Sequence, residues 1–300
     1  MTSPSAYSLA ALQNYLAQGA NTPTAELVDR VKDETGIVPS HLAPLQDNAM
    51  TTNSIIGIRP VETVATGLIE AGHPTKDFHI KGKSANKSPF SLAWAEGSLS
   101  REHLARWAEN HYHYVGPFAD YLAYIYARTP DHMTDAKDFL LANMYEEEIG
   151  GDRHTDLLIR FAEACGTTRA RVVDQENMSP TTRALQSWCY AVAMREDPVV
   201  AVAGLVVGLE SQVPSIYRKQ TPTLRDKYGF SDEEVEFFDL HIVSDEIHGE
   251  RGYQIVLEHA TTVEMQQRCI KICEVGAQMR LLYTTALYND YVAPELALAA

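Results

Sequence analysis

The stretch FFDLHIVSDEIHGERG (residues 237–252) places His241, Asp245 and His248 at positions i, i+4 and i+7. At about 100° per residue, these offsets fall within an arc of roughly 60° on one face of an α-helix. Two neutral imidazoles and a carboxylate that converge on one point are suitable ligands for Fe(II), Mn(II) or Zn(II). The alternative is a helix whose polar side chains simply face solvent. The triplet by itself fits either interpretation.

Two further stretches favour the metal. NMYEEEIGGDRHTDLL (residues 143–158) puts Glu147 and His154 seven positions apart, which predicts one shared helical face. VVAVAGLVVGLESQVPSIY (residues 199–217) is almost wholly apolar up to position 209 and then places Glu210 in that run. A carboxylate in such surroundings is costly unless it is paired or ligated. Three helices thus supply three histidines and three carboxylates, which predicts a dinuclear site inside a helical bundle.

Two glycines qualify the prediction for the Glu147 helix. Gly150 and Gly151 lie between Glu147 and His154, and each glycine is unfavourable in a helix interior. A distortion there would change which side chains share a face. Glu146 or Glu148 would then replace Glu147 as the ligand.

Composition excludes several classes of protein. The chain has 300 residues, of which 45% are hydrophobic, enough for one large domain or for one domain with an appendage. It has 40 acidic and 25 basic residues, a net charge of -15, and no Lys/Arg-rich run, which argues against a nucleic-acid partner. The N-terminus does not resemble a signal peptide, and the apolar run at 199–209 is too short to span a membrane. We therefore expect a cytoplasmic enzyme without a membrane partner.

The four cysteines support a reducing compartment. Cys165, Cys189, Cys269 and Cys273 form no CxxC motif, and the last two lie in an apolar helical pattern. We expect buried free thiols rather than disulfides or soft metal ligands.

The order of segments predicts an all-α protein in two parts. Residues 1–75 read as short helices, a helical extension that serves as a lid, a packing element or a dimer contact. Residues 76–300 form the main domain. We expect long helices there over residues 99–130, with a Ser cap and a kink at Pro117, then over 143–158, 179–197, 198–220, 231–260 and 262–289. No convincing strand follows residue 75.

These ligand-bearing segments resemble the haem-oxygenase-like di-iron oxidases and oxygenases, a superfamily that also includes quinone-cofactor synthases and TenA-like enzymes. The resemblance covers roughly residues 80–290. It rests on GSLSREHLARWAENHYHYV (residues 97–115), on EEEIGGDRH followed by LLIRFAEACG (residues 146–166), and on Glu210 followed by the HxxxDxxH triplet. The resemblance implies an all-α bundle of about seven core helices.

The same resemblance implies the metal ligands. Glu147, His154 and His248 would hold one iron ion, and Glu210, His241 and Asp245 the other, with Glu147 or Glu210 able to bridge. Some members add a carboxylate from the first long helix, for which Asp120 is the nearest candidate. Glu147, Glu210 and Asp245 would be the carboxylates most directly involved in the chemistry.

The resemblance implies an O2-dependent enzyme with two iron ions that oxidises a small amine or amino-acid-like substrate. N-oxygenation in natural-product biosynthesis is the leading expectation, ahead of oxidative C–C cleavage and desaturation. Arg251, Arg280 and Arg160 are candidates to bind a substrate carboxylate. A homodimer and an external electron donor are also expected.

Two other hypotheses remain open at this stage. One is a metal-independent enzyme on the same fold, as in the quinone-synthase and TenA branches, which uses its acids and histidines as general acids and bases. The other is a non-catalytic helical protein with a structural metal site or a polar core. Six ligand-type residues argue against both.

Overall fold

The computed structural model describes residues 85–149 and 152–295. The predicted extension at residues 1–75 lies outside this range. The α-helices are α6 (Pro89–Glu96), α7 (Arg101–Val115), α8 (Phe118–Arg128), α9 (Thr134–Glu148), α10 (His154–Ala164), α11 (Arg169–Val173), α12 (Pro180–Arg195), α13 (Pro198–Val202), α14 (Val213–Asp226), α15 (Glu236–His259) and α16 (Val263–Leu287). Short 3-10 helices occupy η1 (Ala85–Lys87), η2 (Gln175–Asn177) and η4 (Glu210–Gln212), and π-helical turns occupy η3 (Ala203–Val207) and η5 (Tyr288–Val292).

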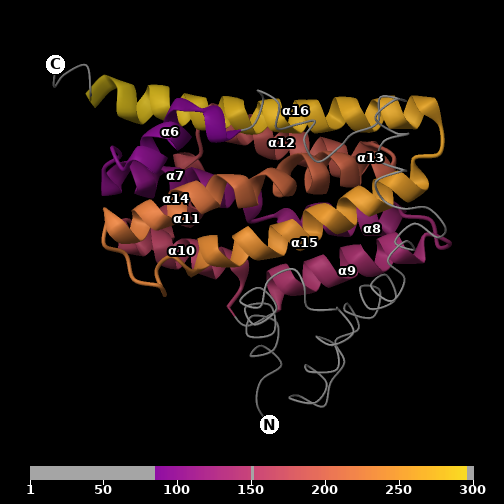
Figure 1. Cartoon of the computed structure of the whole chain (residues 1–300), viewed down its shortest axis with the longest axis horizontal. Helices are drawn as coiled ribbons and strands as arrows, with labels where there is room; N and C mark the ends of the chain where they lie inside the picture. The colour runs from indigo at the N-terminus through magenta and orange to yellow at the C-terminus, as the bar shows by residue number, and fades with distance from the viewer. Residues whose placement is uncertain (1–84, 150–151, 296–300) are drawn as a thin grey trace, which may run out of the picture.

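The described part of the chain contains no strand, so the all-α prediction is confirmed. The two longest helices, α15 and α16, run along the length of the bundle (Figure 1). Helix α14 packs against α15, α8 packs against α9, and α7 contacts α10 and α12. The segment α13–η3 lies against both α15 and α16. The ligand-bearing segments are therefore all in the interior of one bundle.

The predicted helix over residues 99–130 is two helices. Helix α7 ends at Val115 and α8 begins at Phe118, so the chain breaks at Gly116–Pro117 rather than bending through them. Proline has no N–H to donate and its ring clashes with the preceding turn. The predicted Ser cap is confirmed, because Ser100 and His103 form a reciprocal capping box.

Two other helix boundaries differ from expectation. The predicted single helix over residues 143–158 is wrong, because α9 ends at Glu148 and α10 begins at His154. The predicted start at Ser231 is also early. Ser231 and Glu234 bond to each other in a turn, and α15 begins only at Glu236. The glycines at 150 and 151 account for the first difference, since glycine disfavours a helix interior.

The core is rich in aromatic side chains. Trp94, Trp107, Phe161 and Phe238 are buried, and the ring centroids of Trp94 and Trp107 lie 4.8 Å apart. All four cysteines are buried and free, as predicted. The run Pro198–Asp226 is long and apolar enough to cross a membrane, but 89% of its most apolar window is buried inside the protein. The burial fits a core segment, which is how the sequence reads.

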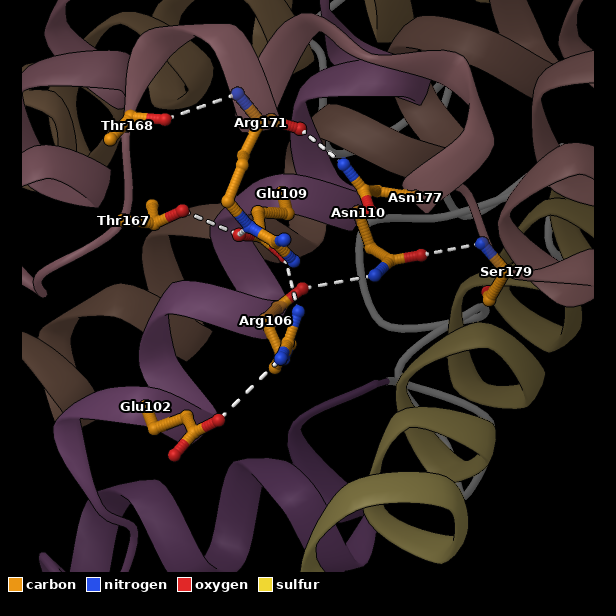
Figure 2. Close-up of polar contacts among 9 residues, drawn as sticks. All are labelled: Glu102, Arg106, Glu109, Asn110, Thr167, Thr168, Arg171, Asn177 and Ser179. Carbon is orange, nitrogen blue, oxygen red and sulfur yellow. Dashed lines mark hydrogen bonds and ion pairs between the residues drawn. The ribbon is translucent and has the colours of Figure 1, made fainter.

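A buried carboxylate fixes the connection after α10 onto α7. Glu109 Oε1 accepts a hydrogen bond from Arg171 Nε at 3.0 Å and another from Thr167 Oγ1, and Glu109 Oε2 lies 3.1 Å from Arg106 Nη1 (Figure 2). The next residue, Asn110, accepts a hydrogen bond from the Ser179 backbone N–H at 2.9 Å. These bonds hold the segment from Thr167 to Ser179 against α7.

Candidate metal centre

The candidate site forms where four elements of the bundle meet. Glu147 lies in the last turn of α9, and His154 is the first residue of α10. Glu210 opens η4, and α15 carries the triplet from its middle. Helix α9 ends at Glu148 and α10 begins at His154, and Glu147 Oε2 lies 3.1 Å from His154 Nδ1. The two residues meet across a break, not along one helical face as the sequence suggested.

Two groups of possible ligand atoms share Glu147. Glu147, His154 and His241 form one group, and Glu147, Glu210 and His248 form the other, each with its ligand atoms within 4.8 Å of one another. Asp245 Oδ1 lies 4.0 Å from His248 Nδ1, and Glu210 Oε2 lies 3.8 Å from the same nitrogen. Asp245 therefore adjoins the second group. A carboxylate shared by two groups is the arrangement of a bridged dinuclear site.

The site is shielded from solvent. The side chains of Glu147, His154, Glu210, Asp245 and His248 are between 4% and 11% exposed. His241 is partly buried, and its ring lies 4.8 Å from that of His154. Buried acids and imidazoles in this density are stable only when they share protons or hold a cation.

The histidine nitrogens are already divided between supporting bonds and the centre. His241 Nδ1 lies 2.6 Å from the Phe237 carbonyl oxygen, which leaves Nε2 for a metal. His248 Nε2 lies 2.8 Å from Glu146 Oε2, which leaves Nδ1 facing Glu210 and Asp245. Such bonds on the far nitrogen fix the tautomer and orientation of a metal-binding imidazole.

The charges at the centre perturb its pKa values in opposite directions. Burial would raise the pKa of Glu147, but His154, His241 and His248 lower it to about 2. Burial raises the pKa of Asp245 to about 7 and raises that of Glu210 well above its usual range. Burial lowers the pKa of His241 to about 3, whereas Glu146, Glu210 and Asp245 overcome burial and raise that of His248 to about 10. Divergent shifts of this kind are typical of functional sites.

Several buried atoms at the centre have no hydrogen-bond partner, which tests whether the residues fit a metal. Glu210 Oε2 and His248 Nδ1 are in this state, and His154 Nδ1 has only the 3.1 Å contact with Glu147 Oε2. Buried polar atoms in proteins are rarely left this way. All three belong to the two ligand groups, so the donor set fits cations that prefer mixed carboxylate and imidazole ligands.

The structure groups the histidines differently from the resemblance. The expected sets joined His248 to Glu147 and His154, and His241 to Glu210 and Asp245. In the structure His241 adjoins His154, and His248 adjoins Glu210. His241 lies nearer the start of α15, on the side from which α10 approaches, and this explains the exchange.

The remaining candidates from the sequence differ in where they lie and in what they contact. Among the three glutamates, Glu147 belongs to the groups, Glu146 bonds to His248, and Glu148 pairs with Arg153 at 3.3 Å. The Asp120 prediction is not supported, because that residue is exposed on α8 and its charge acts on Tyr190.

Of the three candidate arginines, two lie away from the centre. Arg160 pairs with Glu236 and Asp152 near the surface, and Arg251 donates to Gln254. Arg280 is 3% exposed, and its positive charge acts to lower the pKa values of Asp245 and Tyr217.

Sequence reasoning missed a buried polar cluster beside the centre. Tyr283 Oη lies 3.2 Å from His111 Nδ1, and Tyr217 Oη lies 3.2 Å from His111 Nε2. Burial, with the charges of Arg280 and His241, holds the pKa of His111 well below its usual range, so its imidazole is neutral. The alternation HYHY on α7 was the only hint, and spacing alone does not distinguish such a histidine from a core residue.

A second cluster of acids and a histidine lies at the other end of α15. Asp135, Glu258 and His259 place possible ligand atoms within 4.8 Å of one another. His259 Nε2 already lies 2.9 Å from Asp135 Oδ2, and Glu258 is exposed. An ion pair accounts for this cluster.

Comparison with known proteins identifies the family. A family model described as iron-containing redox enzyme matches residues 105–281, more than half of the chain and all six ligand candidates. The chain belongs to this family. A second model, described as anthrax toxin LF subunit, matches residues 35–91, most of which lie outside the described residues.

The relatives of this chain include named enzymes. It is 28% identical to a 4-aminobenzoate synthase from Nitrosomonas europaea over 72% of the chain and 91% of the relative. It is 29% identical to a 4-aminobenzoate synthase from Chlamydia trachomatis over 57% of the chain and 73% of the relative. A pyrroloquinoline-quinone synthase from Granulibacter bethesdensis is 26% identical over 70% of the chain and 82% of the relative.

Solved structures support the same fold. A TenA homologue from Pseudomonas syringae superposes with a TM-score of 0.63 at 17% identity, covering 75% of the chain and 93% of the homologue. A domain from Shewanella denitrificans with a haem-oxygenase-like fold gives 0.61 at 17% identity, covering 77% and 90%. The predicted haem-oxygenase-like fold is confirmed.

Proposed function

We propose that this protein is an O2-dependent non-haem di-iron enzyme that oxidises a small amine or amino-acid-like substrate. The observation that carries the proposal is the pair of ligand groups that share Glu147, the second of which has two ligand atoms without a hydrogen-bond partner, Glu210 Oε2 and His248 Nδ1. Glu147, His154 and His241 would hold one iron ion, and Glu147, Glu210 and His248, with Asp245, the other. When bound, the ions would supply the electrons that activate O2.

The residues of this chain would control access and protons. Val199, Val207 and Leu209, on the segment before Glu210, are buried and would keep bulk water from the centre. The neutral His111, bonded to two tyrosines, would orient the Tyr217 and Tyr283 hydroxyl groups beside the site. Glu146 would hold the His248 ring in place.

N-oxygenation is the chemistry we favour, followed by oxidative C–C cleavage and desaturation. The family of iron-containing redox enzymes and relatives named for an aminobenzoate product support an amine or amino acid as the substrate class. Inserting one oxygen atom of O2 into an N–H bond and reducing the other to water consumes two electrons and two protons. An external electron donor would therefore be a partner, and we also propose a homodimer.

Anaerobic reconstitution with Fe(II) tests the proposal. We expect two iron ions per chain, O2 consumption that depends on iron, and loss of both in Glu147→Ala, because Glu147 belongs to both groups. Asp120→Asn, on the exposed face of α8, is the matched control and should bind iron normally. Failure to bind iron stoichiometrically, or turnover that survives chelation, would contradict the proposal and favour a metal-independent enzyme.

A further inference from the structure

The backbone leaves its regular helical path immediately before Glu210. Helix α13 passes into the π-helical turn η3 at Ala203–Val207, and Glu210–Gln212 then forms a tighter 3-10 turn. Leu209, between them, has φ -100° and ψ -55°. A switch from a wide turn to a narrow one interrupts the regular i→i+4 hydrogen bonds and frees backbone carbonyl groups.

Side-chain donors form hydrogen bonds to three backbone carbonyl groups in this segment. Ser211 Oγ donates to the Val207 carbonyl, and Gln212 Nε2 donates to the Gly208 carbonyl at 2.7 Å. The third carbonyl, that of Leu209, accepts from Arg280 Nη1 at 3.0 Å. The first two donors belong to the same segment, whereas Arg280 is on α16. Arg280 therefore ties the residue before Glu210 to a different helix.

Arg280 has an unusual environment for a buried cation. Its side chain is 3% exposed, and among the described residues no carboxylate oxygen lies within 4.0 Å of its nitrogens. The nearby groups include Tyr114, Tyr217, Tyr283 and the more distant Asp245. Burying a guanidinium without a close counter-ion is costly. The hydrogen bond to the Leu209 carbonyl and the attraction between its charge and the acidic centre would offset that cost.

The Glu210 side chain has few partners that orient it. Asn143 of α9 interacts with its carboxylate, but its Oε2 has no hydrogen-bond partner and lies 3.8 Å from His248 Nδ1. Close helix packing holds the backbone on both sides of Glu210. A Cβ on Gly249 of α15 would lie 2.7 Å from Ser211 Cβ, and a Cβ on Gly276 of α16 would lie 3.2 Å from the Gly204 carbonyl oxygen. The backbone that carries Glu210 is thus packed against both neighbouring helices.

We propose that Arg280 is a positioning residue which, by holding the Leu209 carbonyl, aims Glu210 at the metal position that it would share with Glu147 and His248. The position formed by Glu147, His154 and His241 does not involve this peptide. Loss of Arg280 therefore weakens one metal position selectively. The inference rests on the proposed dinuclear centre.

Titration of the purified protein with Co(II), followed by absorption and by equilibrium dialysis, tests the selectivity. We expect Arg280→Met to weaken one of the two binding events by about 10-fold or more and to leave the other within about twofold. Arg280→Lys, which retains a donor and the charge, should recover much of the loss. Arg128→Met is the matched control, because Arg128 also donates to backbone carbonyls, those of Ala193 and Glu196 at the end of α12, and neither residue belongs to a ligand group.

Double variants assign the affected position. In a His154→Ala background, which retains the Glu147–Glu210–His248 group, Arg280→Met should weaken the remaining Co(II) binding by about 10-fold or more. In a His248→Ala background it should have little effect. Equal losses in both backgrounds, or equal affinities with and without Arg280, would overturn the inference.

Hydrogen exchange of the metal-free protein provides a readout independent of metal loading. Arg280→Met should accelerate exchange of the amides at residues 208–213 and leave those of α7 unchanged. Uniform acceleration throughout the chain would indicate only a general structural role and would overturn the inference. A wild-type protein that binds fewer than two ions would refute the proposed function, while local exchange would still decide whether Arg280 holds the Glu210 segment.

Discussion

At His248 only one of the two ring nitrogens has a hydrogen-bond partner, and this division determines how the imidazole would hold a metal. Nε2 bonds to Glu146 on α9, whereas Nδ1 faces Glu210 and Asp245. The carboxylate of Glu146 thus does not compete with Glu147 for a metal ion. It orients the ligand that Glu147 and Glu210 would join.

Replacing Glu146 with Gln should weaken metal binding by about 10- to 100-fold at the His248 position, the usual effect of losing a carboxylate behind a histidine ligand. Co(II) titration measures the change. Glu148→Gln is the control, because Glu148 pairs with Arg153 and does not belong to either ligand group. Identical affinities in the two variants would show that Glu146 does not support the centre.

The Asp135–His259 pair should make stability depend on pH. The hydrogen bond from Asp135 raises the pKa of His259 against burial, while burial of Asp135 is outweighed by His259, so that the pKa of Asp135 is lowered. Glu258 and Arg251 face the same pair. The pair contributes fully to the free energy of unfolding between about pH 4 and pH 6.5, which are the pKa values of Asp and His in the unfolded chain. This contribution is lost as pH rises through the raised pKa of His259.

Urea unfolding of the wild type and His259→Gln at pH 5.5 and pH 8.5 measures that contribution. Because both side chains are partly exposed, we expect the wild type to exceed the variant by about 1 kcal/mol or less at pH 5.5. The difference should disappear at pH 8.5. A difference of the same size at both pH values would contradict the assignment.

At the scale of the elements, helical spacing predicted which side chains share a face of α15. It failed for Glu147 and His154, because α9 ends between them. His241, Asp245 and His248 lie on one unbroken helix, α15, so the periodicity argument applied directly. Glu147 and His154 lie on different helices, α9 and α10, and no helical period describes how they meet. The structure brings the predicted residues close together, but the geometry that joins Glu147 to His154 differs from the one predicted.

Other features depend on contacts between distant segments and had no signal in the sequence. The exchange of His241 and His248 between the two ligand groups follows from where α10 and η4 approach α15. The π-helical turn before Glu210 lies in an apolar run that looks like regular helix. Tertiary packing overrides local propensity at both places.

The cluster around Glu109 should stabilise the α7 connection measurably. Glu109→Ala removes the acceptor of Arg106, Arg171 and Thr167, and we expect a loss of about 2 kcal/mol in the free energy of unfolding. Urea denaturation with an unchanged m-value would measure it. Glu102→Ala, which removes an exposed partner of Arg106 on the same helix, should cost less than about 0.5 kcal/mol. Equal costs for the two variants would contradict the role of burial.

For the whole molecule, metal binding would join segments that lie far apart in the chain. The ligand groups connect α9, α10, η4 and α15, so a bound ion stabilises the folded state and has few equivalent partners in the unfolded chain. With Mn(II) at about 100 times its Kd, we expect about 2.7 kcal/mol of added stability from one site. Thermal unfolding with and without chelator measures it. A shift that persists in Glu147→Ala would place the bound metal elsewhere.

The wide turn at Ala203–Val207 also changes how this segment would respond to a change in length. A π-helical turn holds one more residue than an α-helical one, so deleting a single residue there would allow a regular α-helix to form. Because the wide turn takes up its extra residue locally, the chain on the two sides of that deletion would keep its phase, and Glu210 would still face its partners. In a regular helix the same deletion would rotate every later side chain by about 100°.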